Sequence, residues 1–268
     1  MIYKAKKSMG QNFLKSKPAL NMMCEAGEVG NKDIVLEIGP GKGALTEKLL
    51  EKAGRVIAIE KDRDLFEFLQ EKFTDEIKNN KLILIEEDIL DFNLTTYYLL
   101  PATYKIIANI PYNITGAILK KFLSGDNQPE RMVLLVQKEV AERIVARDGK
   151  ESILSLSIKA YGTPKYIMKV SKRFFSPSPK VDSAIIAITN ISKDNFASRA
   201  EENRFFELVR AGFAHKRKVL RKNLEGVTKN SHKINEIFEK LGINGKARAE
   251  DITFEKWLEI TRHLSTVF

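Results

Sequence analysis

Asn109, Ile110, Pro111 and Tyr112 form a tetrapeptide whose groups could present an adenine amino group to an electrophile. That amino group is a poor nucleophile because its lone pair is delocalised into the ring. The side-chain oxygen of Asn109 and the backbone carbonyl of Ile110 can accept both amino hydrogens, which holds the lone pair toward a methyl donor. Pro111 stiffens the turn, and the Tyr112 ring can stack on a base taken out of its helix. On its own, such a tetrapeptide is more typical of an ordinary turn after a strand.

The tetrapeptide follows one of several apolar runs that predict a doubly wound α/β sheet. The run at 34–38 enters a glycine-rich turn and leaves into a helical pattern marked by Leu45 and Leu49. Such folds bind ligands beyond the carboxyl ends of their strands, which is where the turn and the tetrapeptide both fall. The later strands are predicted at 56–60, 82–85, 105–108, 131–138, 166–175 and 181–189, the last two as an antiparallel hairpin.

The spacing of Gly39, Gly41 and Gly43 indicates the type of ligand. A dinucleotide-binding turn would need its third glycine at Ala44, and no Gly-Lys-Ser/Thr of a phosphate-binding loop is present. Pro40 also removes a backbone N–H donor from the loop that would have to cradle phosphates. S-adenosylmethionine (SAM) contains no phosphate and suits this turn. The alternative is a tight strand-to-helix connection that binds no ligand.

Acidic residues end the next two predicted strands. Glu60 stands at the tip of the second strand, where a carboxylate can accept both hydroxyls of a ribose. Alternatively, Glu60 is a surface charge beside Lys61. After the third strand, a carboxylate could accept an N–H of the cofactor's adenine, and the residues alone leave three choices: Glu86, Glu87 and Asp88.

Composition favours a polyanionic partner. The 268 residues carry a formal net charge of +10 and have a pI near 9.4, which favours nucleic acid before membrane. The single cysteine, Cys24, excludes an internal disulfide, and one cysteine with three scattered histidines predicts no metal site. The apolar runs are too short to span a membrane, and no secretory signal is evident. We therefore expect a soluble, cytoplasmic protein.

The first 17 residues are basic and contain no acid. They could contact nucleic acid or form a solvated arm. A helix is predicted to begin at Ser16-Lys17-Pro18 and to end at Gly27. The lysines that precede or open this helix are Lys4, Lys6, Lys7, Lys15 and Lys17.

At this point the chain resembles a known family, the RsmA/KsgA type of ribosomal RNA adenine dimethyltransferases. The resemblance extends over essentially the whole chain, and the motifs occur in the family's order. They are Gly10 to Leu14, Glu37 to Gly41, Asn109 to Ile114, Gln137 to Val140, and Phe175 to Ser183.

The resemblance implies roles for individual residues. Phe175 would form a second aromatic wall of the target-base pocket, opposite Tyr112, and so join the tetrapeptide as part of the catalytic set; the alternative is a core aromatic beside Phe174. Among the three acids, the resemblance favours Asp88. The residues it implies for SAM binding are Asn12, Leu14, Gly39, Glu60, Asp88 and Asn109, with Gly41 in the same turn.

The predicted organisation is a catalytic domain at 1–190 and a helical RNA-binding domain at 191–268. The first is a Rossmann-like SAM-dependent methyltransferase sheet, mostly parallel with the last strand antiparallel. Residues 190–268 contain 16 Lys and Arg against 11 Asp and Glu. A helical face from Phe206 to Leu224 is apolar, and basic residues fall on another side. A solvated face is the alternative for the basic residues, which are Arg210, Lys216, Arg217, Lys218, Arg221 and Lys222.

The resemblance implies SAM-dependent dimethylation of N6 on two adjacent adenosines in a hairpin near the 3′ end of small-subunit (16S) ribosomal RNA. The expected partner is that RNA within an immature 30S-type particle, with no membrane and a monomeric enzyme. Two alternatives remain open: an Erm-type methylase of large-subunit RNA, and a non-catalytic ribosome-assembly or transcription factor that uses the same surface. A DNA adenine methylase is disfavoured because it should carry a larger specificity domain.

Overall fold

The computed structural model describes residues 5–6, 9–93, 103–228 and 231–265. The chain divides into two compact units. The sheet unit contains Met1–Ala141 and Gly162–Ile191, and the helical unit contains Glu142–Tyr161 and Ser192–Phe268. The helical unit thus begins close to the predicted boundary at 190, but it also takes in residues 142–161, which the sequence had assigned to the catalytic domain.

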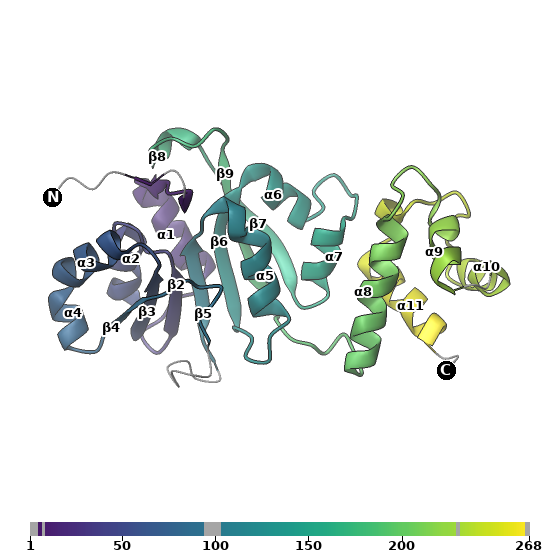
Figure 1. Ribbon diagram of the computed structural model, residues 1–268, viewed down its shortest axis with the longest axis horizontal. Helices are drawn as coiled ribbons and strands as arrows, with labels where there is room; N and C mark the ends of the chain where they lie inside the picture. Colours follow the sequence, from purple (N-terminus) through teal and green to yellow (C-terminus); the bar gives the residue numbers. More distant parts are fainter. Residues whose placement is uncertain (1–4, 7–8, 94–102, 229–230, 266–268) are drawn as a thin grey trace. The chain divides into compact units, whose positions relative to one another are not determined.

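The sheet unit is built on seven strands in the order β4-β3-β2-β5-β6-β9-β7 (Figure 1). All are mutually parallel except β9, the last in the chain, which is antiparallel to β6 and β7. The predicted fold class is therefore confirmed. Chain order reverses between β2 and β5, which opens a crevice beyond their carboxyl ends. The strands are β2 Ile34–Ile38, β3 Arg55–Glu60, β4 Leu82–Glu86, β5 Lys105–Asn109, β6 Arg131–Gln137, β7 Thr163–Val170 and β9 Ser183–Thr189.

Helix α1 has the bounds that its capping residues predict. The Ser16 side chain accepts a hydrogen bond from the Ala19 N–H, and Gly27 ends the helix. A Cβ at Gly27 would lie 2.3 Å from Ile107 Cδ1, so only glycine allows α1 to end this close to the sheet. The helices that begin in this unit are α1 Lys17–Ala26, α2 Ala44–Lys52, α3 Arg63–Lys72, α4 Thr74–Lys78, α5 Thr115–Leu123 and α6 Lys138–Ile144.

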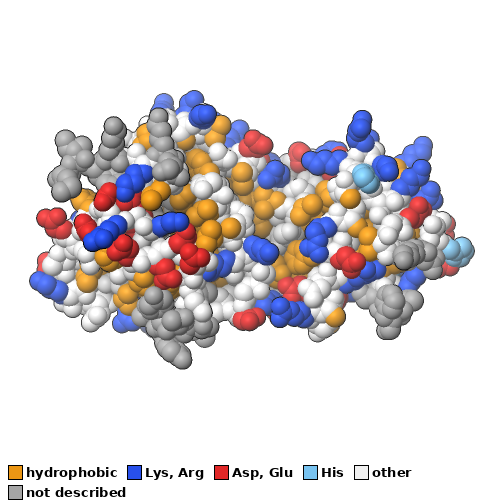
Figure 2. All heavy atoms as spheres, viewed as in Figure 1, with side chains coloured by type: hydrophobic (Ala, Val, Ile, Leu, Met, Phe, Trp, Pro, Cys, Tyr) orange, Lys and Arg blue, Asp and Glu red, His pale blue; other side chains and the backbone are white. Residues whose placement is uncertain are grey.

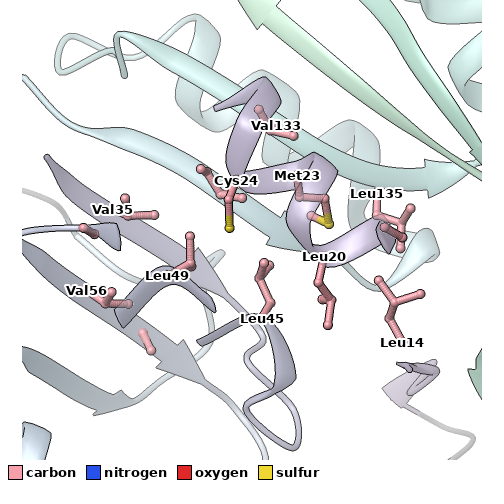
Figure 3. Packing of buried hydrophobic residues seen from close by; sticks show 14 of the residues in the cluster. Leu14, Leu20, Met23, Cys24, Val35, Leu45, Leu49, Val56, Val133 and Leu135 are labelled. Atoms are coloured by element: carbon pink, nitrogen blue, oxygen red, sulfur yellow. The ribbon is translucent and has the colours of Figure 1, made fainter. Parts of the chain in front are cut away.

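Helices α1 and α2 pack on one face of the sheet (Figure 3). Met23 and Cys24 of α1 and Leu49 of α2 are almost fully buried there, over strand residues such as Val35 and Val133. The strands are covered on both faces, because consecutive residues in β2, β3 and β5 are buried. This explains why they occur in the sequence as uninterrupted apolar runs.

The predicted strand over residues 166–175 is wrong in its bounds. Strand β7 ends at Val170, and residues 172–174 form a short 3₁₀ helix. Phe175–Ser176 is a separate strand, β8, which pairs with β1, Phe13–Leu14, instead of with β9. We call residues 171–182, between β7 and β9, the excursion. The side chain of Asp182 accepts a hydrogen bond from the Lys172 N–H at 3.0 Å, which draws the two ends of the excursion together.

The helical unit contains α7 Ile153–Lys159, α8 Arg199–Phe213, α9 Leu220–Thr228, α10 Ser231–Lys240 and α11 Phe254–Ser265. The predicted helical face from Phe206 to Leu224 is wrong because α8 ends at Phe213. Asn223 Nδ2 caps that end, donating to the carbonyl oxygens of Gly212 at 2.6 Å and His215 at 3.2 Å. The turn between α8 and α9 therefore carries Arg217, which shares no helix with Arg210.

Residues 142–161 belong with the helical unit because their contacts lie there. The Tyr161 ring stacks on Phe206 with ring centroids 5.9 Å apart, and its hydroxyl bonds to Glu202. The Glu151 N–H also donates to the Glu250 carbonyl at 2.8 Å. These contacts join residues distant in sequence, so the local pattern of 142–161 does not reveal them.

Candidate active site

A pocket of about 560 Å³ lies at the carboxyl ends of the parallel strands, within the sheet unit. The strand order predicts this position, since the crevice between β2 and β5 is where chain order reverses. The segments that line it are residues 9–15, 37–42, 59–61, 87–89 and 109–114, together with Leu20, Ala44, Leu45, Leu65 and Ser176.

The glycine turn that follows β2 has a backbone that requires glycine. Gly39, Gly41 and Gly43 all have positive φ, at 65°, 60° and 78°. A Cβ at Gly41 would lie 2.9 Å from the Phe13 ring, and one at Gly43 would lie 2.6 Å from the Phe73 ring. The turn therefore brings bare backbone to the pocket and allows Phe13 to cover it.

Glu60 lies at the pocket end of β3 with only 6% of its surface exposed. Its Oε2 accepts the Gly41 N–H at 3.1 Å and its Oε1 accepts the Asp62 N–H at 2.9 Å. Burial raises the pKa of this carboxyl, and the two backbone N–H groups oppose that rise. Each oxygen of a carboxylate can accept a second hydrogen bond. Glu60 is thus oriented by the glycine turn and retains acceptor capacity toward the pocket.

The structure narrows the choice among the three acids at the end of β4, of which Glu86 is the last residue of the strand and Glu87 and Asp88 follow it. Glu87 and Asp88 line the pocket, whereas Glu86 is exposed and does not. Asp88 Oδ2 accepts from Lys61 Nζ at 2.5 Å, and Oδ1 accepts the Leu90 N–H at 2.9 Å. Burial would raise the pKa of Asp88, but Lys61 and the Leu90 N–H hold it below its usual value.

The tetrapeptide after β5 forms another wall of the pocket. Asn109 Nδ2 donates to the backbone carbonyl of Asn12 at 3.2 Å. This contact uses the amide nitrogen, so the amide oxygen is the group that can accept from a substrate amino group. The Tyr112 hydroxyl lies 2.6 Å from Ser183 Oγ, which fixes the ring, and burial raises its pKa. Asn109 through Tyr112 all border the cavity, as the sequence predicts.

Phe175 takes a different position from the other predicted site residues. Its side chain is 5% exposed and belongs to the hydrophobic core that contains Leu14 and Leu20. Strand β8 places it opposite Leu14, and the next residue, Ser176, lines the pocket. The burial fits the core interpretation, and a role for Phe175 at the target base stays a prediction.

Sequence reasoning missed a clamp that holds the N-terminal segment over the pocket. Asp62 is 1% exposed and accepts from Lys6 Nζ at 2.6 Å and from Gln11 Nε2 at 2.7 Å. Its own N–H donates to Glu60. The signal was present in the motif Gly10-Gln11-Asn12, but its partner lies about fifty residues away. Lys4 and Lys7, also predicted for the arm, lie outside the described residues, and Lys15 and Lys17 are exposed.

Sequence reasoning also missed Glu37, a buried carboxyl on β2 that borders the pocket. It is 1% exposed, and burial raises its pKa to about 8. Within the described parts of the chain, its Oε2 has no hydrogen-bond partner. Such an acceptor favours a ligand that brings its own hydrogen-bond donor.

Comparison with known proteins identifies the family. The family model described as "Ribosomal RNA adenine dimethylase" matches residues 2–266. The chain belongs to this family. It is 38% identical to a protein of Fusobacterium nucleatum named "Ribosomal RNA small subunit methyltransferase A", over 98% of each chain.

Two solved structures extend the match to the fold. A dimethyladenosine transferase from Plasmodium falciparum is 27% identical with a TM-score of 0.78, over 92% of this chain and 95% of that one. The 23S rRNA methyltransferase ErmE is 25% identical with a TM-score of 0.79, over 95% of this chain and all of that one. The first of these proteins is named for dimethyladenosine and the second for the methylation of 23S rRNA, in agreement with the family.

Enzymes of the rRNA adenine dimethylase family use SAM, and the pocket residues fit it. SAM has a ribose diol, an adenine amino group and an ammonium group, and it lacks phosphate. Glu60 offers acceptors for the diol, and Glu87 and Asp88 are the acids available to the amino group. The Oε2 of the buried Glu37 carboxyl, which has no hydrogen-bond partner in the described parts of the chain, is a polar atom that a donor on the ligand could satisfy. The observed donor and acceptor set therefore suits SAM.

The basic residues predicted to bind RNA lie in the helical unit. Figure 2 shows Lys and Arg side chains gathered over the end of this unit that carries α9 and α10. Arg221 differs from the rest, because its Nη1 donates to Asn235 Oδ1 at 3.1 Å and its Nε lies 3.9 Å from Glu225. The predicted residues with exposed side chains are Arg210, Lys216, Arg217, Lys218 and Lys222.

No helix in the described ranges is both long and apolar enough to cross a lipid bilayer.

Proposed function

We propose that this chain transfers methyl groups from SAM to N6 of adenosine in small-subunit ribosomal RNA and produces N6,N6-dimethyladenosine. The targets are two adjacent adenosines in a hairpin near the 3′ end, and the protein acts as a cytoplasmic monomer on an immature small subunit. The observation that carries the proposal is the placement of Asn109 and Ile110 on the same pocket as Glu60. A target amino group and a cofactor ribose can then be held on one cavity.

The residues of the pocket divide into binding and orienting groups. Glu60 holds the ribose, with Glu87 or Asp88 at the adenine. When bound, SAM supplies a methyl group made electrophilic by its sulfonium. The amide oxygen of Asn109 and the carbonyl of Ile110 accept the amino hydrogens and direct the lone pair. With the amino group held in this way, its nitrogen would bond the methyl carbon as the carbon–sulfur bond breaks, and the resulting ammonium would release a proton to water.

Dimethylation requires the same groups to act twice. After the first transfer the nitrogen retains one N–H, so Asn109 and Ile110 are no longer equivalent acceptors. Tyr112, fixed by Ser183, can keep the base stacked while the amino group turns. The half-buried tyrosine stays protonated, since burial raises its pKa, and it contributes a neutral stacking surface.

Methyl transfer to isolated subunits tests the proposal. Purified protein is incubated with methyl-labelled SAM and with small or large subunits from cells that lack it. We expect label in the small-subunit RNA alone. Label in the large subunit would favour the Erm-type alternative, for which the similarity to ErmE is the supporting observation. Tight binding to small subunits without any label would favour the non-catalytic assembly factor.

A further inference from the structure

The chain between β7 and β9 exposes apolar side chains beside the pocket. In the described parts of the chain, five large hydrophobic side chains are notably exposed, and two of them, Phe174 at 36% and Val181 at 46%, lie in this excursion. Neighbouring Phe175 is buried at 5%. The chain therefore buries one ring of the Phe174–Phe175 pair and leaves the other toward solvent, a placement that favours contact with a partner.

Hydrogen bonds hold Phe174 in this position. The Lys15 N–H donates to the Phe174 carbonyl at 2.8 Å. Ser178 Oγ donates to the Lys172 carbonyl at 3.0 Å, and the Lys172 N–H donates to Asp182 Oδ1 at 3.0 Å. The backbone that carries the Phe174 ring is therefore fixed by hydrogen bonds, and it needs little further ordering when a partner binds.

Phe174 adjoins the proposed target-base pocket. Lys15, whose N–H it accepts, lines that pocket, and so does Ser176, two residues further along the chain. A nucleotide chain that placed one base in the pocket would carry its next nucleotide over the rim. Phe174 lies at this rim.

The charge around Phe174 complements a phosphate backbone. Residues 163–182 contain one acid, Asp182, which pairs with Lys169 at 2.9 Å. The Arg173 guanidinium carbon lies 5.0 Å from the centroid of the Phe174 ring, a cation–π arrangement. The cations in this range are Lys165, Lys169, Lys172, Arg173 and Lys180.

We propose that Phe174 and Arg173 form a stacking platform for the unpaired base next to the target adenine. Stacking on aromatic rings and arginine planes is how proteins hold bases of single-stranded RNA. The proposal rests on the proposed function, since it requires an RNA adenine as the target. It adds a second base subsite, which would hold the neighbouring adenosine while the first is methylated.

Two exposed phenylalanines allow a matched test. Phe68 of α3 is 37% exposed and has Lys72 Nζ 5.9 Å from its ring centroid, but it belongs to a helix and not to the segment between β7 and β9. Phe174→Ala should raise the KM for small subunits about tenfold, and Phe174→Trp should restore it. SAM affinity should stay unchanged in both variants. Phe68→Ala should match the wild type in every measurement.

Photocrosslinking identifies the occupant. Benzoylphenylalanine at position 174 should crosslink to the nucleotide next to the methylated adenosine, as mapped by reverse transcription, whereas the same group at position 68 should not. Equal KM values for Phe174→Ala and Phe68→Ala would overturn the platform. So would a crosslink from position 174 to a ribosomal protein or to a distant RNA segment. In either case wild-type methylation would leave the proposed function standing, whereas a wild type that methylates no RNA would remove both.

Discussion

The two units of the molecule hold their functional side chains in different ways. In the sheet unit, Glu60 and Asn109 are tied to backbone groups of Gly41, Asp62 and Asn12. In the helical unit, the basic side chains predicted to meet RNA are exposed, with Arg221 the exception. Methyl transfer needs reacting atoms in a fixed geometry, whereas attraction to phosphates acts over a longer range and tolerates movement. Single substitutions should therefore matter more in the pocket than on the basic surface.

The largest expected effect is at Glu60. Its two oxygens should each accept a ribose hydroxyl, and hydrogen bonds to a charged group are worth about 1.5–3 kcal/mol each. Glu60→Ala should therefore weaken SAM binding at least about 100-fold, as measured by calorimetry. Glu60→Gln, which keeps the size of the side chain, should fall between Glu60→Ala and the wild type.

Glu86 provides the control for this experiment. It is the residue of β4 that pairs in register with Glu60, yet it is exposed and does not line the pocket. Glu86→Ala should bind SAM as the wild type does. If Glu60→Ala were folded by circular dichroism and bound SAM equally well, Glu60 would have no role in the site.

A second prediction concerns the pH dependence caused by Glu37. Burial raises its pKa from 4.5 to about 8 in the folded chain, so the folded state holds this proton where the unfolded state has lost it. The free energy of unfolding without cofactor should therefore fall as pH rises from about 4.5 to about 8, by up to about 1.4 kcal/mol per pH unit. Glu37→Gln should remove that part of the slope in urea unfolding.

The exposed Glu71 on α3 serves as the comparison for Glu37. Glu71→Gln should leave the pH dependence of unfolding unchanged. A Glu37→Gln variant with the wild-type slope would show that Glu37 ionises normally in the folded chain, and its unpartnered oxygen would then need another explanation.

The smallest effect per substituted residue is expected for the exposed basic side chains of the helical unit. Replacing Lys216, Arg217 and Lys218 together with Gln should lower the salt slope of small-subunit binding by about 0.7–0.9 units for each phosphate contact removed. SAM affinity should not change. Binding measured over a range of salt concentrations gives the slope.

Arg221 sharpens this prediction, because its guanidinium already contacts Asn235 and Glu225. Arg221→Gln should change the thermal stability more than the salt slope. The opposite result would be a wild-type salt slope in the triple variant and a flattened slope in Arg221→Gln. In that case Arg221 would contact RNA, and Lys216, Arg217 and Lys218 would not.

The features that the sequence predicted are those that depend on a few consecutive residues. The buried strands appear as apolar runs, and Glu60 and Asn109 were found because each ends such a run at the ligand-binding edge of the sheet. The capping residues Ser16 and Gly27 likewise defined α1 without reference to the rest of the chain. These signals need only a few consecutive residues.

The features that were missed depend on partners far away in the sequence. The break between α8 and α9 depends on Asn223 capping Gly212, and a helical pattern alone runs through it. The clamp between Gln11 and Asp62 and the pairing of β1 with β8 join segments separated by about 50 and 160 residues. The burial of Phe175 follows from that pairing, which no local pattern reveals.

Mass spectrometry of small-subunit ribosomal RNA tests the central claim most directly. Cells lacking the protein are complemented with the wild type or with Asn109→Ala, whose folding is checked by thermal unfolding. We expect N6,N6-dimethyladenosine at two adjacent positions near the 3′ end with the wild type, and its absence in the uncomplemented cells and with Asn109→Ala. Dimethyladenosine that persists without the protein, or monomethyladenosine as the only product of the wild type, would contradict the account.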